Sequence, residues 1–425
     1  MTHKGLGTRQ IAFLAAVLVF LAPVLRARAD ERGEAEDITS GCRIVLNAPA
    51  GRISLITDGK YTTSCGTEKT GHPWMTISSG RPMYGLYLCF AVMPAEYIVQ
   101  RETGAEEWET LYQGNTDFYH MFYPLDGYGR IRVYVPSDDR TVMGFSEVYV
   151  FGEGEVPEWV QRWNPTPEKA EILFLAAHPD DELLFLGSAI AWYGVDQQRD
   201  IVVAYLTESN DCRRSEALNG LWTLGIRTYP VFGGFPDCAG KTNRLKDIYR
   251  ETGGKDRVQG WVTELYRRFR PDVVVTHDPE GEYGHMQHRM MADAAAAAFD
   301  LAAYPDCFPD TARKYGTWQV LKLYLHLYGD PEEQTRFNWD IPLPSLGGMT
   351  ANERAEEAFS RHESQQGKGR ESRGVFTAFS VAEYGVKRYP NTAFGLYASR
   401  VGPDIAHDDF LENTLPIVVD DEDED

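Results

Sequence analysis

Apolar and polar positions follow two different patterns along the chain. Between residues 37 and 156, short apolar or alternating runs, such as 85–90 and 130–135, are separated by Gly, Pro, Asp and Asn. Regularly spaced short runs with turn residues between them are typical of antiparallel strands. Residues 37–156 are therefore expected to form an all-β sandwich.

From residue 171 onward, apolar strands alternate with helical patterns. The pattern predicts strands at 172–177, 201–207 and 272–276, and helices from about 181, at 214–224 and at 285–299. Because alternation of strand and helix is typical of a parallel sheet, residues 170–412 are expected to form an α/β domain. Its expected architecture is a Rossmann-like parallel sheet with helices on both faces. Residues 157–169, which are rich in proline and lack periodicity, are the expected linker.

The N-terminus has the pattern of a signal peptide. Lys4 and Arg9 precede an apolar run at 11–25, and Ala-Arg-Ala at 27–29 has the small-x-small pattern of a cleavage site. The run is shorter than the roughly 20 residues that a bilayer-spanning helix needs. Residues 1–29 are therefore expected to be removed, leaving a secreted or extracytoplasmic protein with no membrane span; an uncleaved anchor is the alternative.

Charge excludes one class of partner. The chain has 42 Lys plus Arg against 63 Asp plus Glu, a formal net charge of −21. No broad basic surface is available for a polyanion, so a nucleic-acid partner is not expected. Residues 413–425 are a strongly acidic tail, and because like charges repel one another, this tail is expected to be unstructured and is given no function.

The first group of candidate chemical residues follows the strand at 172–177 directly. Residues 177–182 read Ala-His-Pro-Asp-Asp-Glu. In open α/β sheets, ligands bind just beyond the carboxyl ends of the strands. Asp180 and Asp181 could simply cap the following helix. Capping accounts for one of them, but not for a neighbouring His and three consecutive carboxylates.

A second group lies at residues 281–288, after the strand at 272–276. His285 and His288 are three positions apart at the start of a predicted helix, so their side chains share one face. Such a pair is more often found on a surface than on a metal. Here, however, His178 and His277 each follow a predicted strand at the same edge of the sheet, which favours a common site.

Together the two groups contain two imidazoles and a carboxylate: His178, Asp181 and His288. Three protein ligands with an open fourth position suit a hydrolytic zinc site. Zinc lowers the pKa of a bound water to about 7. The same ligand types suit Fe²⁺ or another divalent metal, so the identity of the metal is left open. Asp180, the neighbour of Asp181, could stay unligated and act as a general base.

Residues 171 to about 410 resemble the PIG-L/LmbE-like family, whose members remove acetyl groups from N-acetylglucosamine-type amides. The ordered set of matching stretches is Ala-His-Pro-Asp-Asp-Glu at 177–182, Arg-Arg-Ser-Glu at 213–216, Leu-Gly at 224–225, Phe-Pro-Asp at 235–237, Tyr-Gly-His-Met-Gln-His at 283–288 and Ala-Phe-Ser-Arg-His-Glu-Ser-Gln at 358–365. No single stretch would suffice, but the ordered set is specific.

The resemblance implies a role for each site residue. Three side chains would ligate zinc: His178, Asp181 and His288. Asp180 would be the general base, and His285 would stabilise the tetrahedral intermediate and protonate the leaving amine, with Tyr283 helping to hold the oxyanion. Two further side chains match positions that hold sugar hydroxyls: Arg213 and Asp237. Without the family pattern, Arg213 would read as a surface salt bridge with Glu216, and Asp237 as a turn residue.

The chain departs from the family pattern at Gln287, where an Asp is common. An Asp could orient an imidazole or raise its basicity, and a neutral amide does so less strongly. Gln287 is therefore expected to affect the pKa of His285, and to affect the rate of the reaction more than its type. His362, in the last matching stretch, is expected to be a helix or pocket-wall residue and not a ligand.

The N-terminal region resembles a discoidin-type, galactose-binding-like jelly roll in the pattern at 42–47, 57–59 and 145–152. Carbohydrate binding is therefore a candidate role for residues 37–156. Three aromatic side chains could stack on sugar rings, although in a sandwich such residues are more often core: Trp74, Tyr84 and Trp108.

The predicted function is zinc-dependent hydrolysis of the N-acetyl group of an N-acetylhexosamine-containing glycan or glycoconjugate. An export signal together with an additional jelly roll favours an extracellular saccharide over a small intracellular glycoside. Two alternatives remain, an amidase acting on a different acylated small molecule and a non-catalytic carbohydrate-binding protein. The intact ligand set and Asp180 speak against the second alternative.

Overall fold

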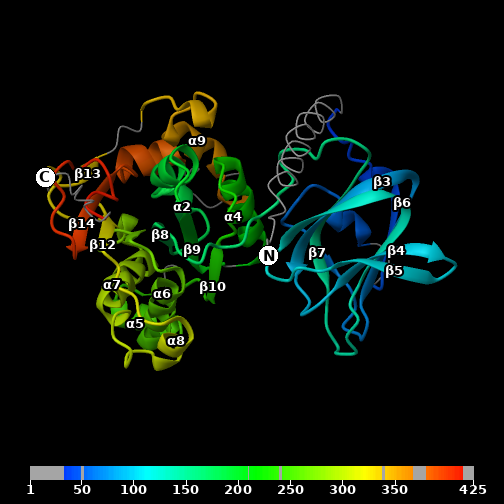
Figure 1. Cartoon of the computed structure of the whole chain (residues 1–425), viewed down its shortest axis with the longest axis horizontal. Helices are drawn as coiled ribbons and strands as arrows, with labels where there is room; N and C mark the ends of the chain where they lie inside the picture. Colours follow the sequence, from blue (N-terminus) through cyan, green and yellow to red (C-terminus); the bar gives the residue numbers. More distant parts are fainter. Residues whose placement is uncertain are drawn as a thin grey trace, which may run out of the picture. The chain divides into compact units, whose positions relative to one another are not determined.

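The computed structural model describes residues 33–48, 52–208, 210–238, 242–336, 340–366 and 380–414. The predicted signal peptide at 1–29 lies outside these residues, as does the predicted acidic tail beyond residue 414. The chain divides into two compact units, Met1–Gln161 and Arg162–Asp425, and this boundary falls within the predicted linker (Figure 1). In the part of the chain that is described, no helix is long and apolar enough to span a bilayer.

The N-terminal unit contains one hydrogen-bonded antiparallel sheet. Its strands are β1 (Cys42–Leu46), β2 (Cys65–Gly66), β3 (Trp74–Val92), β4 (Ile98–Gly104), β5 (Glu107–Gln113), β6 (His120–Tyr134) and β7 (Gly144–Phe151). Their order is β2-β7-β3-β6-β4-β5, and β1 pairs with β3 beside this path. The predicted runs at 85–90 and 130–135 lie within β3 and β6. The two-layered sandwich and its galactose-binding-like form stay predictions, because all the described strands belong to one sheet.

Alternation along the long strands separates a buried face from a polar face. Met75 and Ile77 of β3 pair with Val133 and Ile131 of β6, and all four side chains are buried. Successive strand residues point to opposite sides of a sheet, so the residues between them face away from this core. Thr76, for example, pairs with Arg132 on the polar side.

The C-terminal unit is built on a second sheet of seven strands. These are β8 (Ile172–Ala176), β9 (Ile201–Thr207), β10 (Val231–Phe235), β11 (Val273–Thr276), β12 (Lys322–His326), β13 (Thr335–Arg336) and β14 (Ala393–Ser399), in the order β10-β9-β8-β11-β12-β14-β13. The pairs from β10 to β12 are parallel.

The prediction of a parallel sheet is wrong for the last two strands, because β14 is antiparallel to both β12 and β13. β12 is the last of the parallel strands, and the side of it that faces away from β11 can pair with a strand of either direction. The short sequences of β13 and β14 carry no signal of that direction. The sheet is therefore mixed.

Helices cover both faces of this sheet, as predicted. They are α2 (Asp181–Leu184), α3 (Gly187–Ala191), α4 (Asp211–Leu224), α5 (Leu245–Glu251), α6 (Lys255–Phe269), α7 (Met286–Leu301), α8 (Pro309–Tyr315) and α9 (Ala351–Phe359). In Figure 1, α2, α4 and α9 lie on one side of the strands, and α5 to α8 lie on the other. The helix expected from about residue 181 is divided into the short helices α2 and α3.

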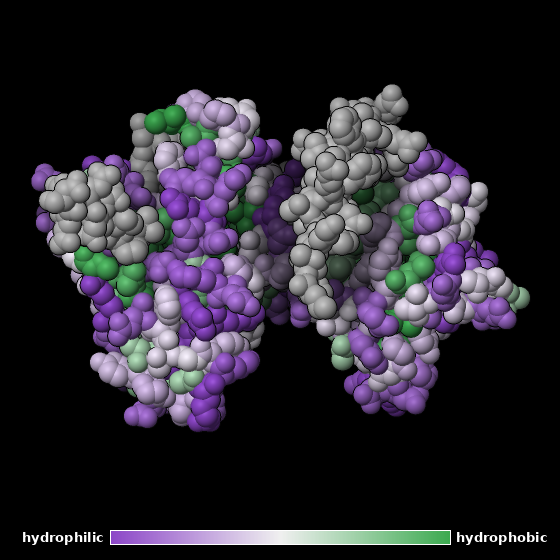
Figure 2. Space-filling view, viewed as in Figure 1, coloured by the Kyte–Doolittle hydropathy of each residue, from purple (hydrophilic) through white to green (hydrophobic). Residues whose placement is uncertain are grey.

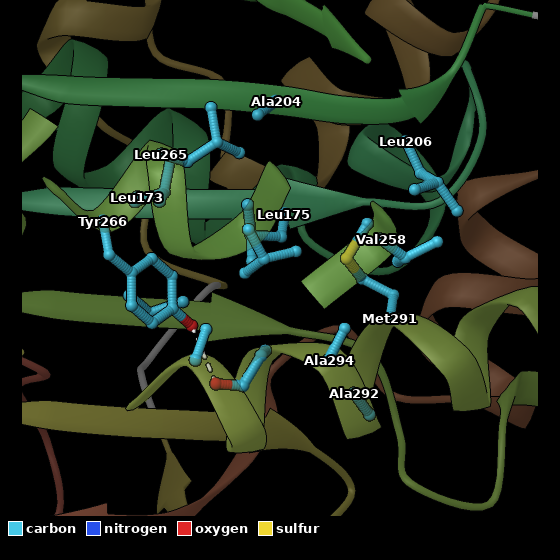
Figure 3. Packing of buried hydrophobic residues seen from close by; sticks show 14 of the residues in the cluster. Leu173, Leu175, Ala204, Leu206, Val258, Leu265, Tyr266, Met291, Ala292 and Ala294 are labelled. Carbon is cyan, nitrogen blue, oxygen red and sulfur yellow. Dashed lines mark hydrogen bonds between the residues drawn. The ribbon is translucent and has the colours of Figure 1, made fainter. Parts of the chain in front are cut away.

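The core beneath the site is a continuous apolar layer. Leu173 and Leu175 of β8 pack with Ala204 of β9, Val258 of α6 and Met291 of α7, and all are buried (Figure 3). On the face seen in Figure 2, by contrast, hydrophilic residues predominate on both units. This packing holds β8 in place in the sheet. It therefore also fixes the position at which the polar residues after β8 leave the sheet.

Candidate metal centre

Two parallel strands deliver histidines to one edge of the second sheet. β8 ends at Ala176 and its neighbour β11 ends at Thr276, so His178 and His277 emerge side by side. The backbone N–H of Ala177 donates to Nε2 of His277 over 2.9 Å. This commits the lone pair of that nitrogen, which makes His277 a poor metal ligand in this arrangement.

Three atoms of the predicted ligand set form a tight triangle. Asp181 Oδ2 lies 3.0 Å from His178 Nδ1 and 3.2 Å from His288 Nε2. His288 Nε2 lies 3.3 Å from His178 Nδ1. All three residues are buried. The backbone N–H of His178 also donates to Asp181 Oδ2 over 2.8 Å, which ties the loop to the carboxylate.

This triangle has the dimensions of a divalent metal site. Tetrahedral zinc with bonds of about 2.0–2.1 Å places its ligand atoms about 3.3 Å apart. Two overlapping His/Asp groups within the described residues could hold an ion, one made of His178, His285 and His288 and the other of Asp181, His277 and His288. The predicted set takes members from both groups. Its side chains fit a divalent cation.

The charges in the triangle also favour a cation. Burial alone would lower the pKa of His288, but Asp181 and Glu282 outweigh it and raise the pKa to about 10. Burial would likewise lower the pKa of His178, but Asp181 raises it. Burial would raise the pKa of Asp181, and the two imidazoles instead hold it well below its ordinary value. The Asp181 carboxylate thus stabilises a positive charge on the neighbouring imidazoles. A metal ion bound between these side chains can supply that positive charge in place of the protons.

Gln287 supports His178. Its Oε1 lies 3.1 Å from His178 Nε2 and also accepts from the backbone N–H of Cys238 over 2.8 Å. Its Nε2 donates to the Pro236 carbonyl over 3.0 Å. A metal-binding imidazole commonly donates its other N–H to an oxygen of this kind. The sequence had linked Gln287 to the pKa of His285; in the structure its partner is the ring of His178.

A carboxylate that sequence reasoning missed holds three imidazoles. Glu282 is fully buried in the 3-10 helix η4 (Glu282–Gly284). Its Oε2 lies 2.9 Å from His277 Nδ1 and 2.7 Å from His288 Nδ1, and its Oε1 lies 2.6 Å from His326 Nδ1. His326 ends β12, the parallel neighbour of β11, so the same strand-end rule that found His178 would have found it if β12 had been identified.

Asp180 is held apart from Asp181 by its backbone. Its φ of 126° lies in a region that costs a non-glycine residue on the order of 1–3 kcal/mol and persists only where the surroundings impose it. Its N–H donates to Glu182 Oε2 over 2.7 Å, and its side chain makes no capping bond to α2. The simple capping interpretation of Asp180 is therefore wrong.

Arg213 approaches Asp180 from the first turn of α4. Its guanidinium lies 3.0 Å from Asp180 Oδ1 and donates to the Pro179 carbonyl. The Arg213 side chain is largely buried, and Glu216 lies farther away at 3.9 Å, so the pair is no surface salt bridge. Burial raises the pKa of Asp180 to about 6, and Arg213 opposes that rise. Arg213 thus favours the ionised form of Asp180.

The remaining predicted site residues lie around the same point. Asp237 follows β10, and its Oδ1 is 3.9 Å from His178 Nε2. The ring of His285 has its centroid 4.7 Å from that of His178. Its Nδ1 is buried with no hydrogen-bond partner among the described residues, and burial, then His288, lowers the pKa of His285 to about 2. Tyr283 is 46% exposed, with its ring centroid 5.6 Å from that of His285.

His362 lies behind the site. Its Nε2 is 3.0 Å from Glu182 Oε1, and both residues are fully buried. Glu182 in turn accepts from the backbone N–H of Asp180. His362, which follows α9, therefore supports the loop that carries Asp180 through its contact with Glu182. It belongs to neither His/Asp group, in keeping with the expectation that it is no ligand.

A mixed α/β sheet with a His/Asp group beyond a central strand defines an α/β domain able to bind a divalent metal. Residues 173–299 match the family model PIG-L, GlcNAc-PI de-N-acetylase. The predicted resemblance to the PIG-L family is thereby confirmed for that segment.

Similar curated proteins are deacetylases. The chain is 31% identical over 179 residues to 1D-myo-inositol 2-acetamido-2-deoxy-alpha-D-glucopyranoside deacetylase 1 of Frankia casuarinae, covering 36% of this chain and 57% of that protein. It is 30% identical over 182 residues to the 1D-myo-inositol 2-acetamido-2-deoxy-alpha-D-glucopyranoside deacetylase of Rhodococcus jostii, covering 36% and 60%. The chain thus spans about three fifths of the length of these relatives.

Among solved structures, the chain is similar to N,N'-diacetylchitobiose deacetylase from Pyrococcus horikoshii. The sequence identity is 18% and the TM-score 0.36, with 46% of this chain and 71% of that chain covered. At that TM-score the likeness carries no functional argument.

Proposed function

We propose that the protein is a divalent-metal-dependent N-deacetylase that hydrolyses the N-acetyl group of an N-acetylhexosamine-containing glycan or glycoconjugate, releasing acetate and a free amine. One observation carries the proposal: His178 Nδ1, Asp181 Oδ2 and His288 Nε2 lie within 3.0–3.3 Å of one another inside the PIG-L segment. The names of the similar curated proteins, deacetylases of a 2-acetamido sugar, support this substrate class.

His178, Asp181 and His288 would hold the metal, which we propose to be Zn²⁺, with Fe²⁺ or another divalent ion as the alternative. Such a cation supplies Lewis acidity, polarising a carbonyl and making water a better nucleophile at neutral pH. Gln287 and Glu282 orient the two imidazoles by accepting from their other ring nitrogens.

Asp180 is the proposed general base. It is buried next to the triangle, and its carboxylate pairs with Arg213. The Arg213 guanidinium at 3.0 Å favours the anionic form, which is the form able to accept a proton from the attacking water. Asp180 can therefore accept that proton without also acting as a metal ligand.

His285, Tyr283 and two polar neighbours complete the proposed site. His285 is proposed to stabilise the developing oxyanion, with Tyr283 assisting at the exposed side. The proton that Asp180 takes from the attacking water has to reach the leaving amine. His285, whose imidazole rests neutral, accepts this proton from Asp180 at one ring nitrogen and then gives it to the amine. Arg213 and Asp237 are proposed to contact sugar hydroxyls.

We also propose that the protein is exported and meets its saccharide substrate outside the cytoplasm. The charge pattern and apolar run in residues 1–29 support export. The net charge of −21 supports a partner other than nucleic acid.

The test is acetate release from a panel of N-acetylhexosamine monosaccharides, oligosaccharides and glycoconjugates, with metal content measured on the same samples. Wild type is expected to release acetate with one metal per chain. Asp180→Asn is expected to keep the metal and lose activity by about 10²–10⁴-fold. His288→Ala is expected to lose the metal as well.

Two substitutions outside the site serve as controls. Asp310→Asn matches the first variant at a position whose side chain is 89% exposed. His72→Ala matches the second, at a half-exposed histidine of the N-terminal unit. Both are expected to behave as wild type. Absence of acetate release from every sugar, with metal still bound, would favour an amidase with another substrate, and absence of any metal would overturn the site.

A further inference from the structure

A second pocket lies in the N-terminal unit, on the polar face of its sheet. It has a volume of about 650 Å³ and is lined by side chains from β1, β3 and β6 and from the region that begins β5. Three arginines and two tryptophans give it its character: Arg43, Arg130, Arg132, Trp74 and Trp108. The pocket lies wholly within the N-terminal unit and shares no residue with the proposed metal centre.

The strand register explains why these side chains meet. Arg43 of β1 pairs with Ser78 of β3, which in turn pairs with Arg130 of β6. Thr76 pairs with Arg132 two residues along. Because residues two apart on a strand share a face, these positions line one surface while the intervening residues enter the core. The pocket is thus fixed by the most regular part of the sheet.

The aromatic side chains of the pocket are partly accessible. Trp74 and Trp108 are half-buried, so part of each ring is available to a ligand. The guanidinium of Arg132 lies 4.4 Å from the ring centroid of Trp108 and 4.4 Å from that of Tyr134. Stacking on both sides limits the freedom of Arg132, so a ligand that pairs with it loses little further side-chain entropy.

The charge of the pocket is opposite to that of the chain. Arg130 is paired with Glu102 at 2.5 Å. Arg132 donates instead to the neutral Oε1 of Gln100, through Nε over 2.9 Å and through Nη2 over 2.5 Å, which leaves its Nη1 for an external partner. Among the described residues, no carboxylate lies within salt-bridge distance of Arg43 or Arg132, and Glu106 is the acidic residue of the lining. Two arginines therefore remain for an external anion, in a protein of net charge −21.

We propose that this pocket binds an acidic saccharide, a sugar unit that carries a carboxylate or a sulfate. The guanidinium fork of Arg43 matches the geometry of such an acid group, and Nη1 of Arg132 offers a further charged donor. The rings of Trp74 and Trp108 offer apolar surface to the C–H face of the sugar. The polar side chains of Thr76 and Ser78 lie between the arginines and are available to hydroxyls. This inference does not depend on the proposed deacetylase function.

Calorimetric titration of the full chain tests the proposal with three probes: trigalacturonate, a sulfated chondroitin disaccharide and neutral maltotriose. At least one acidic probe is expected to bind at least tenfold more tightly than maltotriose, and to weaken as salt is raised. The two acidic probes tell carboxylate from sulfate recognition. Because Trp74 and Trp108 line the pocket, binding is also expected to change tryptophan emission.

Variants locate the binding. Arg43→Gln and Trp108→Ala are each expected to weaken binding of the acidic probe at least tenfold. Arg140→Gln, which removes one exposed arginine elsewhere in the same unit, is the matched control and is expected to bind as wild type. Thermal unfolding of each variant checks that it is folded; Arg43 is exposed, so its replacement leaves the core intact.

Three results would overturn the proposal: equal affinity for maltotriose, absence of binding by all three probes, or undiminished binding in folded Arg43→Gln and Trp108→Ala. Acetate release is measured separately, so failure of this pocket to bind is distinguishable from failure of the proposed deacetylase.

Discussion

Glu282 is a single residue on which the arrangement of three imidazoles depends. Its two oxygens accept from His277, His288 and His326, all at Nδ1. Each of these rings therefore presents Nε2 away from Glu282, and for His288 that nitrogen is the one that faces Asp181. A carboxylate is suited to this position because it offers two acceptor oxygens and no donor.

We expect Glu282→Gln to weaken metal binding about 10–100-fold, which is the usual effect of losing a partner of a ligating imidazole. A glutamine offers one oxygen, so at least one of the three N–H groups would face an amide donor. The measurement is competition with a chelator of known affinity. Glu280→Gln, at a side chain that is 80% exposed, is the control. Unchanged metal affinity in folded Glu282→Gln would contradict this role.

Arg213 has two proposed contacts, one to the sugar and one to Asp180. If its main action is to keep Asp180 ionised and in place, Arg213→Gln should lower kcat about 100-fold and leave KM nearly unchanged. Arg361→Gln, an exposed arginine, serves as the control. A rise in KM with kcat unchanged would instead assign Arg213 to uniform binding of the substrate.

At the scale of elements, the sequence predicted the strands that are buried on both faces. β8, β9 and β11 have uninterrupted apolar runs and were expected within one residue of their observed bounds. The break between α2 and α3 was not predictable, because it depends on a distant helix. A Cβ at Gly187 would lie 2.9 Å from the Cβ of Ala355 in α9, so this close approach requires glycine.

The proposed ligand set could be assembled from the sequence because its members adjoin strongly patterned elements. His178 and Asp181 follow β8, and His288 lies in the first turn of α7. His326 was missed for a physical reason: its significance arises only when β12 pairs with β11, and that pairing is a long-range event. Glu282 was missed because the turn between β11 and α7, which brings it against His277 and His288, has no periodic pattern. Local sequence patterns thus indicated the proposed metal ligands, but not the residues that orient the imidazoles of those ligands.

Arg267 joins α6 to the end of α7. Its guanidinium donates to five carbonyl oxygens, those of Leu301, Ala302, Tyr304, Cys307 and Phe308. Four of these oxygens also accept a backbone N–H, from Tyr304, Trp318, Cys307 and Ala312 in turn. Arg267 therefore adds a second hydrogen bond to most of them and ties α6 to the segment between α7 and α8. The positive charge also complements the helix dipole at this end.

Arg267→Leu is therefore expected to reduce the free energy of unfolding by about 3 kcal/mol, because it removes a set of hydrogen bonds made by a buried charged side chain. Arg267→Lys should restore little of this, since one ammonium cannot reach acceptors spread around a planar fork. Arg268→Leu, the exposed neighbour, is the control. Chemical denaturation gives the measurement, and a loss below about 0.5 kcal/mol would contradict the role given to Arg267.

At the scale of the molecule, the hydrophobic pattern changes near residue 160, where the chain divides into two compact units, each with its own core. Separate cores are expected to unfold in separate transitions. Since the proposed metal ligands all lie in the C-terminal unit, a chelator should lower the Tm of one transition only. Calorimetry with and without chelator checks this, and equal shifts of both transitions would count against it.

The transition that the chelator leaves unchanged should respond to pH through Glu147. This residue is fully buried in β7, and burial, with Asp58 adding to it, raises the pKa of Glu147 to about 7. The folded unit therefore binds a proton that the unfolded chain, with a pKa near 4.5, releases. The resulting stabilisation is complete below about pH 4.5 and is lost as the pH rises through 7. The Tm of this transition should accordingly fall between pH 5 and pH 8.

Glu147→Gln removes the titrating group but keeps an oxygen that can accept from the N–H of Lys60, as Glu147 Oε1 does over 2.9 Å. Its Tm should vary less with pH than that of wild type, and it should exceed the wild-type Tm most at pH 8, where the native carboxylate is buried with its charge. Glu153→Gln, at an exposed position just beyond β7, should keep the wild-type slope. A slope unchanged in Glu147→Gln would mean that another group of this unit binds the proton, and it would contradict the role given to Glu147.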